Sequence, residues 1–242
     1  MKNVEKPKGG KMTSPGMNGG NGIFRPAPSS RRQSVTLTAA LSLLTALILS
    51  SCGKPPAMIN RYVLEYPPPV LAKLRPLDAG LEVKLFAVDE TINRTEMVYK
   101  ETPYRTNVYW YNRWRANPGY LVTDYLVRDL RDSKLFTAIF SYDLSGPARF
   151  NLEGDVVDFQ EVDTPGVWHA ALTLNITLLD TDKENITEKV MFQRRYQTQE
   201  PMLTKTPQGL AEAMSRALQK LSRQIIDDVY PAVKQRLGRP KR

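Results

Sequence analysis

Cysteine and histidine are nearly absent from this sequence, whose 242 residues contain one of each, Cys52 and His169. A single cysteine cannot form a disulfide within the chain. A Ser-His-Asp arrangement would have to use His169, which stands in a predicted strand. The short patterns of serine hydrolases, P-loop proteins and zinc peptidases do not occur. We therefore expect no catalytic site, no metal and no cofactor.

One acidic segment comes near to a metal-binding pattern. Asp180, Asp182 and Glu184 alternate like the start of a calcium loop. Asn185 stands where that loop needs glycine, however, and Met191 stands at the position of its last glutamate. We therefore interpret the segment as a solvated turn between two strands.

The one long apolar run extends from Val35 to Leu49 and carries no charge over fifteen residues. It is short for a bilayer span, which needs ~20 apolar residues. Arg31 and Arg32 precede the run and small residues follow it, which is the pattern of a secretory signal. Leu49-Ser50-Ser51-Cys52 resembles the lipobox of bacterial lipoproteins. This resemblance implies that residues 1–51 are a lipoprotein signal peptide and that Cys52 is lipidated, with palmitate among its acyl chains.

Two alternatives remain open at this terminus. An uncleaved membrane anchor would leave Cys52 as a free thiol. Ser30 to Ser34 also resembles part of a twin-arginine export signal, although the aromatic residue usual after the arginines is missing. The sequence therefore does not decide between the general and the twin-arginine export route.

The basic charge of the chain is unevenly distributed. The sequence contains 34 lysines and arginines against 25 acidic residues, but from Cys52 onward the counts are 27 and 24. Five of these 27 lie in the last nine residues. The domain between the signal and the tail is therefore close to neutral, which removes the basis for predicting nucleic-acid binding.

The sequence predicts four parts in the chain. After the signal peptide, residues 52–79 form the lipid anchor, a proline-containing spacer and an edge strand, followed by an α+β domain at 80–231 and a basic tail at 232–242. Apolar–polar alternation predicts strands at 62–66, 81–85, 96–100, 107–111, 136–142, 148–160, 167–179 and 187–197. Apolar residues at three- and four-residue spacing predict helices from Pro118 to about Ser133 and from Pro207 to Pro231.

The strand 167–179 shows the clearest alternation. One face carries Trp168, Ala170, Leu172, Leu174, Ile176 and Leu178, and the other carries His169, Thr173, Asn175 and Thr177. The first helix has apolar residues on one face and Asp124, Arg128, Asp129 and Arg131 assigned to the other. The sum is an α+β fold in two layers, an antiparallel-rich sheet with two amphipathic helices on one face.

Aromatic residues and arginines interleave between Tyr104 and Tyr120. Tyr, Trp and Arg are enriched at protein interfaces because they bury a large area and keep a polar tip. We therefore take Tyr109, Tyr111, Arg113 and Trp114 as candidates for binding a partner, with Trp114 as a partly exposed anchor. Alternation would point Tyr109 and Tyr111 one way and Trp110 the other. Packing in the core is the alternative for each of them.

Several segments in order resemble the ABC-type transport auxiliary lipoproteins. They are Cys52-Gly53 followed by prolines and Tyr62-Val63-Leu64, then Met97-Val98-Tyr99, Arg113-Trp114, Ser133-Lys134-Leu135-Phe136, Leu152-Glu153-Gly154-Asp155-Val156 and the terminal helix. The resemblance implies a non-catalytic lipoprotein at the periplasmic face of the outer membrane. Its partners would be an ABC transporter and mammalian-cell-entry (MCE) proteins that bridge the periplasm in lipid transport. The alternative is an accessory lipoprotein of outer-membrane protein or lipopolysaccharide assembly, and formation of a homo-oligomer stays open.

Overall fold

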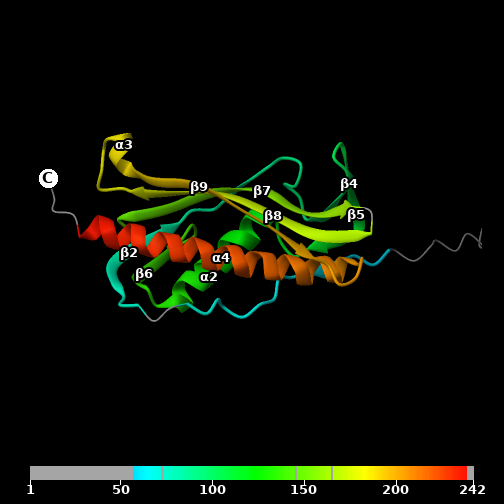
Figure 1. Ribbon diagram of the computed structural model, residues 1–242, viewed down its shortest axis with the longest axis horizontal. Coiled ribbons are helices and arrows are strands. Elements are labelled where there is room, and N and C mark those ends of the chain that lie inside the picture. Colours follow the sequence, from blue (N-terminus) through cyan, green and yellow to red (C-terminus); the bar gives the residue numbers. More distant parts are fainter. Residues whose placement is uncertain (1–56, 72–73, 145, 165, 239–242) are drawn as a thin grey trace, which may run out of the picture. The chain divides into compact units, whose positions relative to one another are not determined.

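The computed structural model describes residues 57–71, 74–144, 146–164 and 166–238, all of them within the unit Pro56–Arg242 (Figure 1). The predicted signal peptide, Cys52 and the end of the basic tail lie outside the described residues. The described residues form nine strands and three helices, in the order β1 (Asn60–Tyr62), β2 (Leu77–Val83), β3 (Ala87–Val88), β4 (Glu96–Thr102), β5 (Arg105–Trp114), α2 (Pro118–Ser133), β6 (Phe136–Ser141), β7 (Phe150–Thr164), β8 (Val167–Asp180), α3 (Ile186–Lys189), β9 (Val190–Pro201) and α4 (Pro207–Leu237).

The long strand β7 organises the sheet. Along one side it pairs antiparallel with β8 over its whole length, and β8 pairs antiparallel with β9. Along its other side, β7 pairs in parallel with β2, then with β3 and then with β4. Strand β4 continues antiparallel to β5, β5 pairs in parallel with β1, and β2 pairs in parallel with β6. The predicted α+β fold is confirmed, with one mixed sheet whose paired length is mostly antiparallel.

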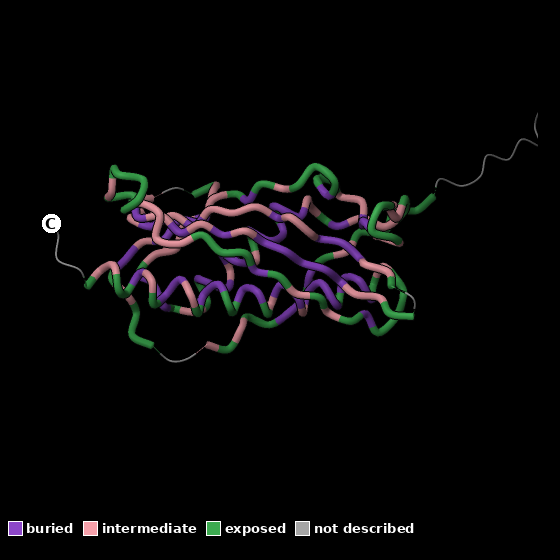
Figure 2. Tube along the Cα trace, turned by 45° about the horizontal axis from the view of Figure 1, so that its top comes forward, coloured by how far each residue is buried: buried purple, intermediate pink, exposed green. Residues whose placement is uncertain are grey.

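Helices α2 and α4 lie on one face of this sheet, and the core fills the space between the layers (Figures 1 and 2). The face of β8 that was assigned to the core is confirmed, because Leu172, Leu174 and Leu178 have no exposed surface. Leu221 and Ile225 of α4 are equally buried. Burial of a leucine or isoleucine side chain stabilises a fold by roughly 1.5–3 kcal/mol, so this strand and helix contribute much of the stability.

Helix α4 begins as predicted and ends later than predicted. The Thr206 side chain accepts a hydrogen bond from the Gly209 amide at 3.0 Å, and Pro207 occupies the first position. The helix continues through Pro231 to Leu237, so the expected end at Pro231 is wrong. Pro231 has no N–H to donate to the Asp227 carbonyl one turn earlier. Both residues are exposed, so water can bond to this carbonyl instead. Val233, one turn after the buried Val229 on the inner face, is fully buried and holds the extended helix on the sheet.

Several predicted strands have different bounds in the structure, and for two of them the local contacts give the reason. The first strand was expected at 62–66, but β1 ends at Tyr62, and Leu64 enters the core with no exposed surface. The strand expected from Thr187 starts at Val190, because the Asn185 side chain accepts a hydrogen bond from the Thr187 amide at 3.0 Å and caps the short helix α3. In both places a local side-chain or core contact decides the backbone where alternation is weak.

Candidate functional site

Trp114 is a core residue rather than an exposed anchor. Only 1 % of its surface is exposed, and its ring meets Phe159 edge-on with centroids 5.0 Å apart. Its amide donates to the Thr95 carbonyl at 2.7 Å, which ties the end of β5 to the residue before β4. The expectation that Trp114 offers a partly exposed anchor is therefore wrong.

Tyr109 attaches the β4–β5 hairpin to β7, and Arg113 forms an ion pair within the hairpin. The Tyr109 hydroxyl donates to Glu161 Oε2 at 3.0 Å, and its ring lies 4.8 Å from the ring of Tyr99. Arg113 forms an ion pair with Glu96 at 3.0 Å. Both side chains are half-buried and occupied by these internal contacts, so they have little surface left for a partner.

Trp110 and Tyr111 are the exposed aromatic residues of β5, with 73 % and 56 % of their surfaces accessible. The register of the hairpin explains this exposure. Tyr109 pairs with Met97 and Arg113 pairs with Glu96, so the three residues between them on β5 bulge out with no partner on β4. This bulge breaks the alternation, and Tyr109 and Tyr111 do not share the environment that the sequence predicted for them.

The same β1–β5 edge exposes two aliphatic side chains. Met58 and Ile59 come directly before β1, with 81 % and 44 % of their surfaces accessible. Because Asn60 pairs in parallel with Asn112, the two residues before Asn60 run toward Tyr111 and Trp110. We call these four residues, Met58, Ile59, Trp110 and Tyr111, the β1–β5 apolar patch. The sequence signal for it is weak, since the patch depends on a bulge and on a parallel pairing of distant segments.

A buried acidic pair lies beneath this hairpin. Glu161 is fully buried, and its Oε1 atom has no hydrogen-bond partner among the described residues. Burial and the neighbouring Asp163 carboxyl raise the pKa of Glu161 to about 7, although the hydrogen bond from Tyr109 lowers it. Asp163 in turn contacts Lys205, which precedes α4. The cluster therefore joins β5, β7 and the start of α4, and the pKa of its Glu161 carboxyl lies near neutral pH.

Asp129 forms a second buried polar cluster between the two helices. Only 1 % of its surface is exposed, so its assignment to the solvent face of the first helix is wrong. Its carboxylate accepts hydrogen bonds from the Tyr66 hydroxyl at 2.9 Å, from the Ser222 hydroxyl of α4 at 2.6 Å and from Arg128 at 2.7 Å. The Asp129 carboxylate and burial both raise the pKa of Tyr66, with burial the larger cause. These bonds join α2, α4 and the segment after β1.

The face of the sheet opposite the helices is polar and carries no helix among residues 57–238 that are described. Asp155, Asn175 and Arg195 stand in register across β7, β8 and β9, and the Asn175 amide donates to Asp155 at 2.9 Å. A shallow hollow of about 350 Å³ opens beside them. It is lined by Asp158, Ala171, Thr173, Arg195, Gln197, Thr198 and Gln199. Such a face can accept a polar protein surface.

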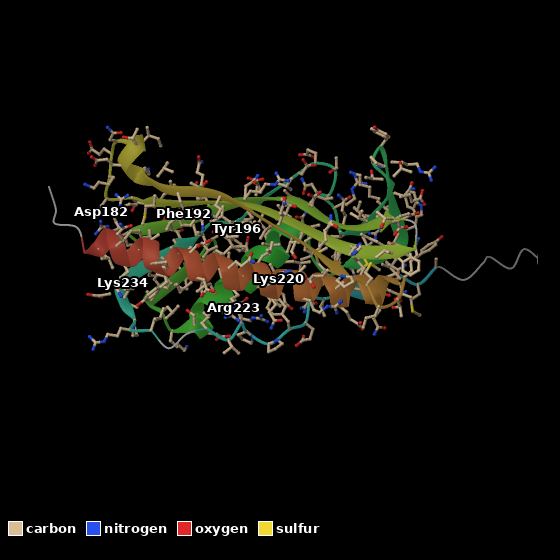
Figure 3. All side chains as sticks on the ribbon, in the orientation of Figure 1. Asp182, Phe192, Tyr196, Lys220, Arg223 and Lys234 are labelled. Atoms are coloured by element: carbon tan, nitrogen blue, oxygen red, sulfur yellow. The ribbon has the colours of Figure 1, made fainter. Side chains whose placement is uncertain are left out.

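On the helix side, Tyr196 connects β9 to α4. Its hydroxyl donates to Asp228 at 2.8 Å, and Figure 3 shows it between the strand and the helix. Arg223 lies on the side of α4 that faces away from the sheet (Figure 3). The outer edge of β9 pairs with no other described strand. The polar sheet face therefore ends at an open strand edge.

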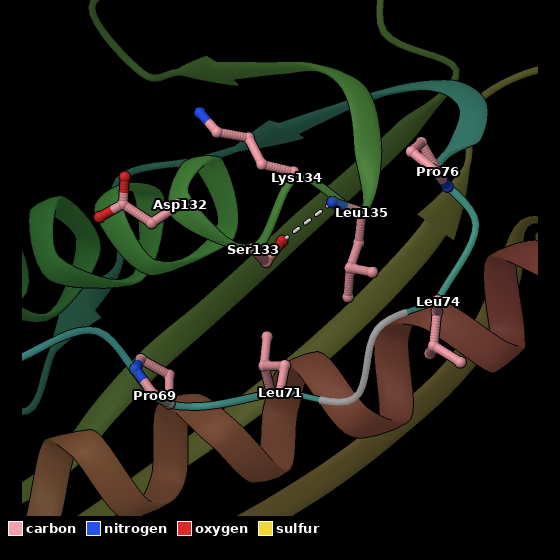
Figure 4. A pocket seen from close by; sticks show the side chains of 8 residues that line it. All are labelled: Pro69, Leu71, Leu74, Pro76, Asp132, Ser133, Lys134 and Leu135. Atoms are coloured by element: carbon pink, nitrogen blue, oxygen red, sulfur yellow. Dashed lines mark hydrogen bonds between the residues drawn. The ribbon is translucent and has the colours of Figure 1, made fainter.

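A second hollow, of about 340 Å³, lies between residues 69–76 and the end of α2 (Figure 4). Its lining includes Leu71, Leu74 and Leu135, together with Ser133. The Ser133 hydroxyl donates to the Leu130 carbonyl at 2.6 Å. It also accepts from the Leu135 amide at 3.2 Å, the bond drawn in Figure 4. Both bonds close the helix end, so this serine has a structural role.

His169 is half-buried on β8, opposite Val162 of β7 and Pro201 of β9. Its side chain forms no hydrogen bond or ion pair with the described residues. No group of three or more histidine, cysteine or acidic side chains within the described ranges is placed to hold a metal ion. In the same ranges, none of the helices has the length and apolar content that a membrane span requires. The geometry thus offers surfaces for association and hydrogen bonds that hold the fold.

Comparison with known proteins gives the context for these surfaces. The family model described as ABC-type transport auxiliary lipoprotein component matches residues 62–226. Among solved structures, protein XCC0632 from Xanthomonas campestris, of family DUF330, is similar with 19% identity and a TM-score of 0.65, covering 76% of this chain and 100% of that one. An uncharacterized protein is similar with 13% identity and a TM-score of 0.56, covering 71% and 99%. A comparison with curated proteins found no match.

The family match covers the sheet and most of α4, and the similar structures share this fold. The family is generally non-catalytic, and its lipoprotein character implies anchoring to a membrane of the cell envelope. The chain belongs to the ABC-type transport auxiliary lipoprotein family and is an auxiliary lipoprotein component of an ABC-type transport system.

Proposed function

We propose that this protein is a non-catalytic component of an ABC/MCE-type lipid transport system of the cell envelope. It is lipidated at Cys52, lies on the periplasmic face of the outer membrane and binds an MCE-type protein that spans the periplasm. The observation that carries the proposal is the family match over residues 62–226. Cys52, at the end of the predicted signal peptide, stands ten residues before that match begins.

The contacts of the chemistry-bearing side chains support a role without turnover. Ser133 is bonded to the backbone at the end of α2, and His169 lies on a different element with no serine paired to it. The buried carboxylates Asp129 and Glu161 bond to side chains that hold the fold together. The energy for transport would therefore come from an ATPase in another subunit.

For the protein partner, we propose the polar face of β8 and β9. The helices occupy the other face of the sheet, and Arg195 and Gln197 are exposed on this one. Exposed arginine at a shallow hollow gives a partner both charge and hydrogen-bond donors. The open edge of β9 adds unpaired backbone groups, to which an extended segment of the partner can bond.

The test is co-purification of the full-length chain from envelope membranes of its own host. We expect an MCE-type protein and an ABC permease to co-purify, and Cys52→Ser to leave an unprocessed precursor that recovers neither. Arg195→Glu should weaken recovery of the MCE-type protein. Arg223→Glu, an exposed arginine on the outer side of α4, is the matched control and should leave recovery unchanged.

Two results would contradict this proposal. Cleavage at a site other than Cys52, with an unmodified cysteine, would remove the lipid anchor. Recovery of an outer-membrane β-barrel protein in place of an MCE-type protein would favour a role in outer-membrane protein or lipopolysaccharide assembly.

A further inference from the structure

We propose that the β1–β5 apolar patch contacts the lipid leaflet to which Cys52 is attached. The proposal rests on the lipidation of Cys52 and extends it, because the folded domain itself then has a membrane-facing side. The patch consists of Met58, Ile59, Trp110 and Tyr111, each with at least 44 % of its surface exposed. Tryptophan and tyrosine favour the boundary between lipid and water, because an apolar ring carries a polar tip.

Chain length places this patch close to the membrane. Met58 is six residues after Cys52. Even a fully extended chain spans at most about 3.6 Å per residue, so Met58 lies within about 22 Å of the lipidated residue. The parallel pairing of Asn60 with Asn112 directs Met58 and Ile59 toward Trp110 and Tyr111. The whole patch is therefore held within reach of the leaflet surface by a short tether.

The dimensions of the domain indicate which of its two ends stays beside the membrane. The 31 residues of α4 make a helix about 46 Å long, at about 1.5 Å per residue. Figure 1 places the first turns of α4 at the end where the described chain begins, and its last turns at the opposite end. A tether of about 22 Å keeps the near end beside the leaflet in every orientation, whereas the far end reaches it only if the domain lies flat. The β1–β5 end is the one that meets the lipid.

The charges beside the patch fit a phospholipid surface. Arg61 of β1 and Arg115 after β5 are both exposed, and neither forms an ion pair with the described residues. The Arg115 amide bonds to the Tyr62 carbonyl at 2.8 Å, which fixes this arginine beside β1. Juxtamembrane arginines are attracted to anionic headgroups by about 1 kcal/mol each. Asn60 and Asn112, bonded to each other at 3.2 Å, add polar groups at headgroup level.

A membrane explains this patch better than the protein interface expected from the sequence. Of the four partner-binding candidates, Trp114 is buried, and Tyr109 and Arg113 are held by Glu161 and Glu96. The remaining exposed group is small, apolar and next to the tether. Lipid anchors combine a covalent chain with a second contact of this kind. We expect this contact to orient the domain so that the polar face of β8 and β9 points along the periplasm.

The test uses the full-length lipidated protein in vesicles of phosphatidylethanolamine and phosphatidylglycerol that contain brominated lipid, which quenches tryptophan emission near the headgroups. The sequence has three tryptophans, and Trp110 is the exposed one. We expect the brominated lipid to quench the part of the tryptophan fluorescence that Trp110 emits. Trp110→Phe should abolish the quenching, and Trp168→Phe, the matched control, should retain it. Thermal unfolding of both variants confirms that they fold.

Each outcome decides the proposal. Quenching that depends on Trp110 supports it, and quenching that persists in Trp110→Phe overturns it. A protein that floats with the vesicles without quenching also overturns it and leaves the proposed function intact. A protein that does not float overturns both. A third result would identify the patch as a protein interface and contradict the lipid contact. In that case Trp110 is not quenched, and Trp110→Ser reduces recovery of the MCE-type protein or of a second copy of this chain.

Discussion

Replacing Asp129 with alanine should destabilise the protein more than any exposed acidic substitution. The Asp129 carboxylate is 1 % exposed and accepts hydrogen bonds from Tyr66, Ser222 and Arg128. Alanine removes the acceptor for two buried hydroxyls and leaves the guanidinium without its ion-pair partner. Breaking a buried ion pair by removing one partner costs about 3–5 kcal/mol. Arg128 can regain water because its side chain is 33% exposed, which places the expected loss toward the lower half of that range.

The assay is thermal unfolding followed by circular dichroism. A loss of ~3 kcal/mol corresponds to a melting temperature lower by roughly 6–12 °C for a domain of this size, at about 2–4 °C per kcal/mol. Asp132→Ala is the matched control, since this aspartate lies one turn later on the exposed side of α2. An exposed substitution of this kind changes stability by no more than about 0.5 kcal/mol.

A double-mutant cycle tests the contact itself. Ser222→Ala removes one donor, and its cost should shrink in the Asp129→Ala background because the two groups share one hydrogen bond. Additive losses would refute the coupling of α2 to α4 through this carboxylate. A cost for Asp129→Ala no larger than that for Asp132→Ala would refute the reasoning as a whole.

Two further expectations follow from burial. Trp114→Ala should cost about 3–5 kcal/mol, whereas Trp110→Ala should stay within about 0.5 kcal/mol; equal shifts in thermal unfolding would contradict the assignment of the two rings. Because the pKa of Glu161 is raised to about 7 from 4.5, the folded state binds more protons than the unfolded state in that window, and stability should fall as the pH rises through it. Glu161 faces Tyr109, Asp163 and Lys205. Glu161→Gln should reduce the pH dependence of the free energy of unfolding, measured with urea from pH 4.5 to 7.5. A variant that keeps the wild-type pH dependence would show that other groups cause it.

The periodic elements of this fold are predictable from the residues alone. In β8 every second side chain is large and apolar, so one face must be buried whatever the neighbours are, and Leu172, Leu174 and Ile176 are. The Thr206-Pro207 pair likewise specifies the start of α4, because the cap and the fixed φ of proline act locally. The end of α4 is different, since the packing of Val233 outweighs the local cost of Pro231.

Residue type misleads where a polar side chain is buried with partners. The spacing of Asp129 from Val122, Tyr125 and Leu126 places it on the apolar face of α2, although its charge favours the solvent face. The decisive partners, Tyr66 and Ser222, are 63 and 93 residues away. Periodicity therefore carried the correct information, and only the tertiary contacts explain how a carboxylate is stable there.

The sequence by itself determined the α+β class and the buried faces of β8 and α4, because these depend on local patterns, and it predicts lipid attachment at Cys52. The tertiary structure decided which aromatic side chains are exposed. Trp110, Tyr111 and Trp114 lie within five residues of one strand, and their environments differ because of a bulge opposite β4 and a parallel pairing with β1. Both features depend on segments distant in the sequence, whose contacts are set when the chain folds and not by the composition of either segment.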